Sequence, residues 1–548
     1  MAHALAGKPV QEQDIIDVQT IVDAYFDNVP DMTNPTQLVS FGTSGHRGTS
    51  VDGTFTDLHV AAITQAICDG RKQFGATGPI FVGQDTHALS QPALVTVLEV
   101  LAGNGVTAMV DCDMDFVPTP SVSRAIIRYN EEHDDKADGI IITPSHNPPD
   151  NGGIKYNTII GGPADTVVTK WIEMRANEYL TAYCESEDFK RISIDNIEPT
   201  AQVPYDYKGL YVEELGDVIN MEAIKAAGPK VLVDTLGGSG ASYWNAIKER
   251  YGLDLTIIHD DYDPTFSFMT YDHDGKVRMD CSSTYVMASV INRIGDFDLA
   301  VGNDPDYDRY GIVVSSGLIS ANTFLTLAAH YLFTTRGWKN KGVGKTVVCT
   351  TMIDKWAADA ETPVFEVPVG FKYFSQLLFD GAIGIGGEES AGASFLKKDG
   401  TVWTTDKDGM IMALLSMEIM AVMGKSALKM ADESLEEFGN PSFGRIDAPC
   451  KKEQKQILKQ MSAELITATT IDGDPITNIR TTSLYNDMPI DGVRVETDKG
   501  WFVARPSGTE DLYKIYGESY KGDLGLVALL TAGEEIVNAA LNGTIETE

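Results

Sequence analysis

Residues 79–113 read PIFVGQDTHALSQPALVTVLEVLAGNGVTAMVDCD. The run PIFVGQD (79–85) is typical of a strand that leads into a loop. Ser90 is placed to cap a helix over residues 91–103, with Pro92 in its first turn. TAMVDCD (107–113) then returns as a second strand. Strand, helix and strand in this order predict a β-α-β unit, which is the repeating element of an α/β domain.

The same alternation of strands and helices recurs along the chain. Further strands are predicted at residues 139–144, 230–235, 253–260, 297–302, 345–350, 363–368 and 382–386, and further helices at 242–252, 284–295, 322–333 and 408–420. The last part of the chain differs. It predicts an amphipathic helix over 451–465, a β-hairpin over 492–504, a strand over 512–519 and a closing helix capped by Asp523.

This order of elements predicts the domain organisation. We expect three similar α/β domains with mixed sheets over residues 1–204, 205–317 and 318–440. A smaller α+β domain should follow over residues 441–548. The length of 548 residues agrees with several domains.

Charge and composition exclude several classes of function. The chain has 43 Lys and Arg against 79 Asp and Glu, a net charge of −36. Such a chain is unsuited to nucleic acid or to an anionic membrane surface. No stretch approaches about 18 uncharged apolar residues, so no membrane span is expected. The six cysteines are isolated and the first residues lack the pattern of a secretory signal, so we expect a cytoplasmic protein.

The segment DPDYDR (304–309) follows a strand that should be buried. In an extended loop alternate residues point the same way, so Asp304, Asp306 and Asp308 would converge. Three adjacent carboxylates repel one another unless a cation neutralises them. Ligation by oxygen alone favours Mg²⁺. A solvated acidic turn is the alternative for a DxDxD motif in so acidic a chain.

Three further loops also follow predicted strands. TPSHNPPDNGGIK (143–155) contains a serine, a histidine and a lysine, GGEESAG (386–392) contains two glutamates, and RPSGTE (505–510) joins an arginine to Ser, Gly and Thr. In open α/β sheets ligands collect at such strand ends. An arginine beside backbone N–H groups is suited to binding a phosphate. Taken alone, the serine loop is more typical of an ordinary turn, and the alternative for RPSGTE is a surface loop with a solvated arginine.

Taken together, the loops resemble the α-D-phosphohexomutases, and among them the bacterial phosphoglucomutases specific for glucose phosphates. The matching segments are FGTSGHRG (41–48), TPSHNPP (143–149), DPDYDR (304–309), GEESAG (387–392) and RPSGTE (505–510). They occur in the order of the family, and the resemblance covers nearly the whole chain. It implies four domains around a central cleft.

The resemblance also implies roles for individual residues. Ser145 would carry the phosphoryl group, with His146, Lys155 and Arg309 as the other catalytic candidates. The metal ligands would be Asp304, Asp306, Asp308 and the phosphorylated Ser145. Substrate binding would fall to Ser44, His46, Arg47, Gly370, Lys372, Glu388, Ser390, Lys407, Arg505, Ser507, Gly508 and Thr509.

The implied reaction interconverts glucose 1-phosphate and glucose 6-phosphate through a phosphoserine enzyme and glucose 1,6-bisphosphate, with Mg²⁺ as cofactor. Phosphomannomutase-like members carry a histidine shortly after the sugar loop, where this chain has Gly392-Ala393-Ser394-Phe395. This departure favours glucose. A phosphomannomutase or phosphoglucosamine mutase, a metal-dependent phosphatase and a non-catalytic sugar-phosphate-binding scaffold remain alternatives. The partners would be small sugar phosphates, and the oligomeric state, monomer or homodimer, stays open.

Overall fold

The computed structural model describes residues 2–42, 45–184, 189–507 and 512–542. The chain divides into two compact units. Unit 1 comprises residues 1–321, 374–382 and 390–429, and unit 2 comprises residues 322–373, 383–389 and 430–548.

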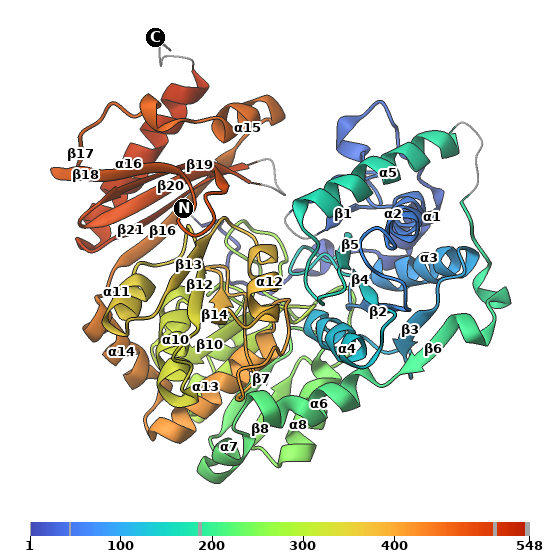
Figure 1. Ribbon diagram of the computed structural model, residues 1–548, viewed down its shortest axis with the longest axis horizontal. Helices are drawn as coiled ribbons and strands as arrows, with labels where there is room; N and C mark the ends of the chain where they lie inside the picture. Colours follow the sequence, from blue (N-terminus) through green and yellow to red (C-terminus); the bar gives the residue numbers. More distant parts are fainter. Residues whose placement is uncertain (1, 43–44, 185–188, 508–511, 543–548) are drawn as a thin grey trace. The chain divides into compact units, whose positions relative to one another are not determined.

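Unit 1 begins with a six-stranded mixed sheet in the order β1-β5-β4-β2-β3-β6. Its strands are β1 His46–Thr49, β5 Asn151–Asn157, β4 Asp138–Ile142, β2 Ile80–Gln84, β3 Ala108–Asp111 and β6 Gln202–Tyr205. The strands β4, β2, β3 and β6 run parallel to one another. The pairs β1–β5 and β4–β5 are antiparallel. The predicted β-α-β unit is therefore the middle of this sheet (Figure 1).

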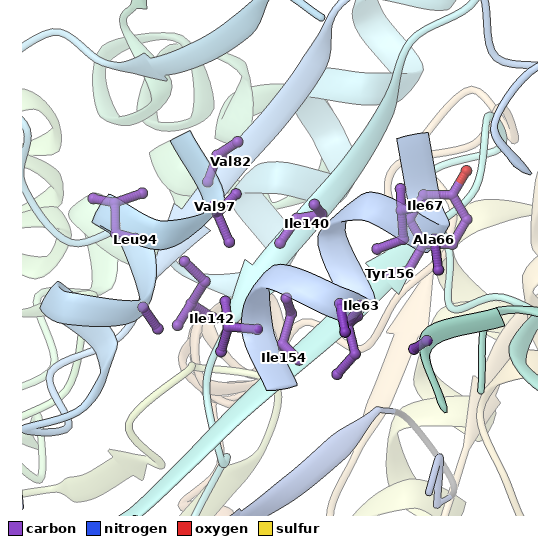
Figure 2. Packing of buried hydrophobic residues seen from close by; sticks show 14 of the residues in the cluster. Ile63, Ala66, Ile67, Val82, Leu94, Val97, Ile140, Ile142, Ile154 and Tyr156 are labelled. Atoms are coloured by element: carbon purple, nitrogen blue, oxygen red, sulfur yellow. The ribbon is translucent and has the colours of Figure 1, made fainter. Parts of the chain in front are cut away.

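Both faces of the sheet are covered by helices. On one face, α2 (Asp57–Gly70), α3 (Ser90–Gly103) and α5 (Thr166–Cys184) pack against alternate residues of the strands. Figure 2 shows Ile63 and Ile67 of α2 and Leu94 and Val97 of α3 gathered around Ile140 and its neighbours. On the other face, α4 (Thr119–Glu132) packs Val122 and Ile126 against Phe81 and Ile141. The strands are buried on both faces, as expected for parallel strands.

Ser90 does not cap the helix as predicted. Leu89 is the N-cap residue of α3, and Ser90 is its first helical residue. The Ser90 hydroxyl donates instead to the buried carboxylate of Asp85 at 2.6 Å. A hydrogen bond to an ionised group is stronger than a capping bond with a neutral backbone N–H. This difference explains why the Ser90 hydroxyl bonds Asp85 and does not cap the helix.

The second sheet of unit 1 has five strands in the order β11-β10-β9-β7-β8. These are β11 Gly317–Leu318, β10 Tyr310–Val314, β9 Leu299–Asn303, β7 Val231–Asp234 and β8 Leu255–Ile258, with α8 (Ala241–Tyr251) between β7 and β8. Leu232, Ala300 and Val313 form a core with the irregular segment 266–294. The helix α13 (Gly409–Met423) contributes no residue to that core and packs against β9, β10 and α7 (Met221–Ala227).

Unit 2 contains parallel strands and an antiparallel sheet. The strand β12 (Gly342–Thr346) lies between β13 (Val364–Val367) and β14 (Ile383–Gly387), in parallel with both. The antiparallel sheet has the order β16-β21-β20-β19-β18-β17. Its strands are β16 Ser442–Pro449, β21 Leu512–Ser519, β20 Gly500–Pro506, β19 Pro489–Thr497, β18 Asp474–Thr482 and β17 Thr470–Ile471. The helices α15 (Lys452–Lys459) and α16 (Gly522–Leu541) pack against this sheet. The predicted α+β character and the hairpin are confirmed.

Some predicted elements differ in extent. The strand expected at 345–350 is β12, which begins at Gly342 because it is paired on both sides from that residue. The helix expected at 284–295 is reduced to α9 (Ala288–Ile291). Its β-branched residues and Asn292 have low helix propensity, and burial of Met287 and Val290 holds the segment instead. The last helix begins at Gly522, and Asp523 accepts from the Ser442 hydroxyl at 2.6 Å instead of capping.

Among the described residues, α16 is long and apolar enough to cross a membrane by length and composition, although no membrane span was predicted from the sequence. The bent pair α13 and α14 (Ala427–Phe438) passes the same test only if counted as one span, across an angle of 87°. In unit 2, α16 packs on the antiparallel sheet and buries Leu529 and Val537 in its core.

Candidate active site

Ser145 lies in the loop between β4 and β5 and is 1% exposed. Its φ of +60° is in the left-handed region, where a residue with a Cβ is strained. The Ser145 N–H donates to Thr143 Oγ1 at 2.7 Å, which holds the backbone in this conformation. Its hydroxyl donates to Asp304 Oδ2 at 3.0 Å. The serine loop and the metal loop predicted from the sequence therefore meet at these two residues.

The loop Asp304–Arg309 connects the antiparallel strands β9 and β10. Asp304, Asp306 and Asp308 are fully buried, and one oxygen of each lies within 4.8 Å of the others. They do not converge through an extended loop as predicted, because Tyr307 adopts a φ of +63° and its N–H donates to the Asp304 carbonyl at 2.9 Å. A turn, closed by the Arg309 N–H on Asp304 Oδ1 at 3.0 Å, brings the carboxylates together.

Three cationic side chains face these carboxylates. Lys155 Nζ lies 2.5 Å from Asp306 Oδ2 and 3.2 Å from Asp308 Oδ2, and Lys407 Nζ lies 2.7 Å from Asp308 Oδ2. Arg309 Nε lies 3.8 Å from Asp308 Oδ1. Burial alone would lower the pKa of Lys155, but Asp306 and Asp308 raise it above its usual value. A Cβ on Gly392 would come within 2.3 Å of Lys407 Cδ, so glycine is needed there for Lys407 to reach the site.

The carboxylates respond to this environment in different ways. Burial and the neighbouring Asp306 raise the pKa of Asp304. Burial acts in the same direction on Asp308, but Lys407, Lys155 and Arg309 outweigh it and lower the pKa of that group. Asp306 Oδ1 and Asp308 Oδ1 are buried without a hydrogen-bond partner among the described residues. Buried carboxylate oxygens left in this way fit a divalent cation, which takes oxygen ligands.

His146 follows Ser145 and lies beside a fourth carboxylate. Its Nδ1 is 3.4 Å from Ser145 Oγ, and its Nε2 is 3.9 Å from Asp280 Oδ2. Arg309 approaches the same Asp280 oxygen at 3.6 Å. Burial, and then Arg309, lower the pKa of His146 well below its usual value.

The predicted first-domain residues lie in different environments. His46 is buried, and its Nε2 lies 2.9 Å from the Thr54 carbonyl while its ring stacks on His59. Arg47 reaches the serine loop, with NH1 at 3.4 Å from Asn147 Oδ1. The structure thus brings Arg47, but not the His46 ring, to that loop. Ser44 lies outside the described residues.

The predicted sugar-binding residues fall in both units. In unit 2, the carboxylate of Glu388 accepts from the Gly370 N–H at 3.1 Å, which joins two of them. Lys372 begins α12 (Lys372–Phe379). In unit 1, Ser390 precedes Ala391, whose carbonyl accepts from the Tyr310 N–H at 3.1 Å and so anchors the turn beside the metal loop.

The predicted phosphate loop follows β20. Arg505 pairs with Lys514 across the sheet, and its Nε is buried without a hydrogen-bond partner among the described residues. The Ser507 N–H donates to the Leu512 carbonyl at 2.8 Å, and this hydrogen bond joins the ends of β20 and β21. Gly508 and Thr509 lie outside the described residues. A buried guanidinium nitrogen that lacks a hydrogen-bond partner among the described residues is suited to binding an anion.

Several residues of the site were not predicted from the sequence. Thr119 donates from its hydroxyl to Asp306 Oδ2 at 2.9 Å and from its N–H to the Asp306 carbonyl at 2.9 Å. Asp85 accepts from the Thr143 hydroxyl at 2.6 Å. Asp85 could have been found, because it follows a strand parallel to the one before Ser145 and so shares its sheet edge. Asp280 carries no such signal, since it lies in an irregular segment.

Comparison with protein-family models matches four consecutive parts of the chain. The descriptions are phosphoglucomutase/phosphomannomutase alpha/beta/alpha domain I for residues 38–182, domain II for 210–317 and domain III for 320–438, and the C-terminal domain for 447–524.

Known proteins resemble the chain over nearly its whole length. A phosphoglucomutase from Komagataeibacter xylinus is 46% identical over 97% of both chains. A probable phosphoglucosamine mutase from Pyrococcus furiosus is 25% identical over 88% of this chain and 93% of that protein. The crystal structure of parafusin, an exocytosis-sensitive phosphoprotein and phosphoglucomutase from Paramecium, matches 94% of this chain and 97% of that one with a TM-score of 0.71. At 20% identity this last likeness shows the fold alone.

Proposed function

Because the chain belongs to the phosphoglucomutase/phosphomannomutase family, we propose that it interconverts glucose 1-phosphate and glucose 6-phosphate. The identity of 46% with a phosphoglucomutase over 97% of the chain supports glucose as the sugar. The observation that carries the proposal is the hydrogen bond of 3.0 Å from the buried Ser145 hydroxyl to Asp304, in a cluster of three carboxylates.

Ser145 is the nucleophile of this proposal. In the first half-reaction, phosphorylated Ser145 transfers its phosphoryl group to the free hydroxyl of the sugar phosphate. The bond from phosphorus to Ser145 Oγ breaks, the bond to the sugar oxygen forms, and the sugar hydroxyl gives up a proton. The resulting glucose 1,6-bisphosphate turns end for end and returns its other phosphoryl group to Ser145. The enzyme is regenerated and the phosphate has changed position.

Asp304, Asp306 and Asp308, with the phosphate on Ser145, would hold Mg²⁺. When bound, the cation would offset the negative charge of the transferred phosphoryl group. The buried oxygens Asp306 Oδ1 and Asp308 Oδ1, without partners among the described residues, support this assignment. Arg309 and Lys407 add positive charge beside the same carboxylates. Fixed charges of this kind lower the barrier because they need no rearrangement during the reaction.

The proton of the sugar hydroxyl needs an acceptor near Ser145. His146 Nδ1 lies 3.4 Å from Ser145 Oγ, and Lys155 Nζ lies 2.5 Å from Asp306 Oδ2. Both side chains are therefore candidates for proton transfer. The environment lowers the pKa of His146 and keeps the ring neutral, whereas it raises the pKa of Lys155. We assign His146 as the group that moves the proton. In the first half-reaction it takes the proton of the sugar hydroxyl and gives it to Ser145 Oγ as the bond to phosphorus breaks, and in the second half-reaction it moves the proton from Ser145 Oγ back to the sugar oxygen. Lys155 is assigned as the group that compensates charge.

The other predicted residues would bind the sugar phosphate. Glu388 and Ser390 would accept or donate hydrogen bonds with two sugar hydroxyls, and Gly370 and Lys372 would help to select the sugar. Arg505, Ser507, Gly508 and Thr509 would bind the phosphate that is not transferred, while Ser44 and Arg47 would lie beside the Ser145 loop. The ring of His46 faces Thr54 and His59 instead, so it is not assigned a contact with substrate. Arg505 suits this role because its Nε is buried and unpartnered among the described residues.

The proposal extends to the cellular setting. The five cysteines whose side chains are described are free thiols, which agrees with a reducing cytoplasm. Activity on mannose or glucosamine phosphates is the alternative, supported by the 25% identity with a probable phosphoglucosamine mutase.

A product assay tests the proposal. Glucose 1-phosphate, mannose 1-phosphate and glucosamine 1-phosphate are offered in turn with Mg²⁺ and the matching bisphosphate. We expect glucose 6-phosphate as the main product, and free glucose would indicate a phosphatase instead. Ser145→Ala should lose several orders of magnitude in kcat, as other deletions of nucleophiles do. Turnover by this variant at the wild-type rate would overturn the assignment of Ser145.

A further inference from the structure

The loop that carries Ser145 is held at both ends by Asp85 and His87, two residues that take no part in the reaction described above. Asp85 is the first residue after β2, and its N–H donates to the carbonyl of Ile142, the last residue of β4, at 3.0 Å. The pairing of these parallel strands therefore places Asp85 directly beside the start of the Ser145 loop.

Asp85 holds the first end of the loop. Its carboxylate is fully buried and accepts from the Thr143 hydroxyl at 2.6 Å. Thr143 Oγ1 in turn accepts from the Ser145 N–H at 2.7 Å. Because the single hydroxyl proton of Thr143 is directed to Asp85, the lone pairs of Oγ1 face Ser145. This relay stabilises the left-handed backbone from which Ser145 Oγ reaches Asp304.

His87 holds the second end of the loop. Its Nδ1 lies 2.8 Å from Asp85 Oδ2, and its Nε2 lies 3.0 Å from the carbonyl oxygen of Asn147. A carboxylate and a carbonyl only accept, so both ring nitrogens must carry protons and the ring is an imidazolium. The positive charge of His87 offsets the buried charge of Asp85. Asn147 lies two residues after Ser145, so the pair brackets the nucleophile from both sides.

We propose that Asp85 and His87 form a positioning pair, which fixes Ser145 Oγ against Asp304 and thereby acts on the phosphoryl-transfer step. This inference rests on the proposed function. The side-chain hydrogen bonds of Asp85 and His87 in the described part of unit 1 join them to each other, to Ser90 and to the Ser145 loop, so loss of the pair should lower kcat and leave KM for the sugar phosphate nearly unchanged. A pair that only stabilised the domain would lower the melting temperature without this selective effect on kcat.

The chain offers a matched control. Ser90 donates to the same Asp85 carboxylate as Thr143 does, also at 2.6 Å, but Ser90 belongs to α3 and does not contact Ser145. Asp85→Ala would leave the buried His87 without its counter-ion and would endanger folding. Thr143→Val and Ser90→Ala each remove one hydroxyl from Asp85 and are better probes. Thr143→Ser keeps the hydroxyl and serves as the rescue variant.

The experiment measures kcat, KM for glucose 1-phosphate and melting temperature for the three variants, at saturating Mg²⁺ and bisphosphate. We expect Thr143→Val to lose about ten- to a hundred-fold in kcat, with KM within about two-fold of wild type. Thr143→Ser should retain most of the wild-type kcat. Ser90→Ala should also retain most of the wild-type kcat, even if its melting temperature is lowered as much as that of Thr143→Val. Equal losses of kcat in Thr143→Val and Ser90→Ala, or a loss confined to KM, would overturn the proposal.

A second measurement separates this inference from the proposed function. Glucose 1,6-bisphosphate labelled in its phosphoryl groups is mixed with dephosphorylated, metal-loaded enzyme, and the rate at which the free Ser145 hydroxyl takes up the label is followed. Wild type that takes up no label would refute the proposed function itself. Label uptake by wild type, with slow uptake in Thr143→Val and fast uptake in Ser90→Ala, supports the positioning pair. Uptake in Thr143→Val as fast as in wild type refutes the pair and leaves the proposed function standing.

Discussion

Lys155 Nζ lies 2.5 Å from Asp306 Oδ2, and both side chains are almost fully buried, at 4% and 1% exposed. The ammonium therefore occupies one oxygen of a carboxylate whose other oxygen has no hydrogen-bond partner among the described residues. A divalent cation and Lys155 would share this carboxylate, and each would reduce the affinity of the site for the other.

The first prediction concerns this sharing. Lys155→Met removes a positive charge from the carboxylates, so Mg²⁺ should bind at least as tightly as it does to wild type. Turnover should nevertheless fall by about 10²- to 10⁴-fold, the range for loss of a proton-transfer group or a charge in the site. Titration of Mg²⁺ by calorimetry and steady-state kinetics measure the two effects. Lys170→Met, at a lysine side chain 62% exposed on α5, is the control, and weaker Mg²⁺ binding by Lys155→Met would contradict the prediction.

The second prediction concerns Asp306. Asp306→Asn replaces one of three anionic ligands by a neutral one, so the concentration of Mg²⁺ needed for half-maximal activity should rise. Activity should recover in part at high Mg²⁺, because the other two carboxylates remain. Asp115→Asn, at a half-exposed carboxylate 39% exposed, provides a comparison. Identical Mg²⁺ titrations for Asp306→Asn and wild type would exclude this loop as the metal site.

The third prediction concerns Arg505. Arg505→Ala should lower kcat/KM roughly ten- to several-hundred-fold for glucose 1-phosphate and glucose 6-phosphate alike, because a charge-assisted contact with phosphate is worth a few kcal/mol. Arg505→Lys should recover only part of this, since an ammonium lacks the planar fork. Kinetics in both directions, with and without added bisphosphate, measure the effect. A loss for one substrate only would contradict a phosphate site shared by both half-reactions.

The fourth prediction concerns the pH dependence of stability. Asp408 is fully buried at the N-cap of α13, where it accepts from Tyr211 and Trp403. Burial raises the pKa of its carboxyl to about 6. Between the pKa of the unfolded chain and this value the folded state binds more protons, so the free energy of unfolding should fall as pH rises.

The size of this effect follows from the shift. Raising the pKa from 3.8 to about 6 corresponds to about 3 kcal/mol, lost between roughly pH 4 and pH 6. Urea unfolding of wild type and Asp408→Asn over this range measures it. The difference between the two proteins should vary with pH, because only wild type can ionise there. If the difference in free energy of unfolding between the two proteins stays constant from pH 4 to pH 7, the raised pKa of Asp408 is refuted.

Strand ends and loops were predictable from the sequence because they are local features. The sequence alone shows the apolar run before Asp304, the loop that follows it and the serine loop after β4. The convergence of the carboxylates was predicted for the wrong reason. A turn with a left-handed Tyr307 produces it, and no residue pattern in DPDYDR indicates that tyrosine would adopt such a conformation.

Residues that act through long-range packing could not be predicted in the same way. Thr119 reaches Asp306 across 187 positions of the chain, and Asp280 approaches His146 from an irregular segment. Nothing in the local sequence of Thr119 or Asp280 indicates a functional role, because their partners in the site lie far away along the chain. Ser90 shows the opposite case, in which the local rule of capping is overridden by a buried carboxylate.

The position of α13 in the chain bears on how the protein is made. The strands β9 and β10 and the helix α7 are complete by residue 318, yet the helix that packs on them spans Gly409–Met423. At 5–20 residues per second, a ribosome would deliver that helix roughly 5–20 seconds after β10. For that interval the apolar surface under α13 stays open to water. A nascent chain stalled near residue 320 should therefore be a good substrate for chaperones, and release from them should coincide with the emergence of Met423.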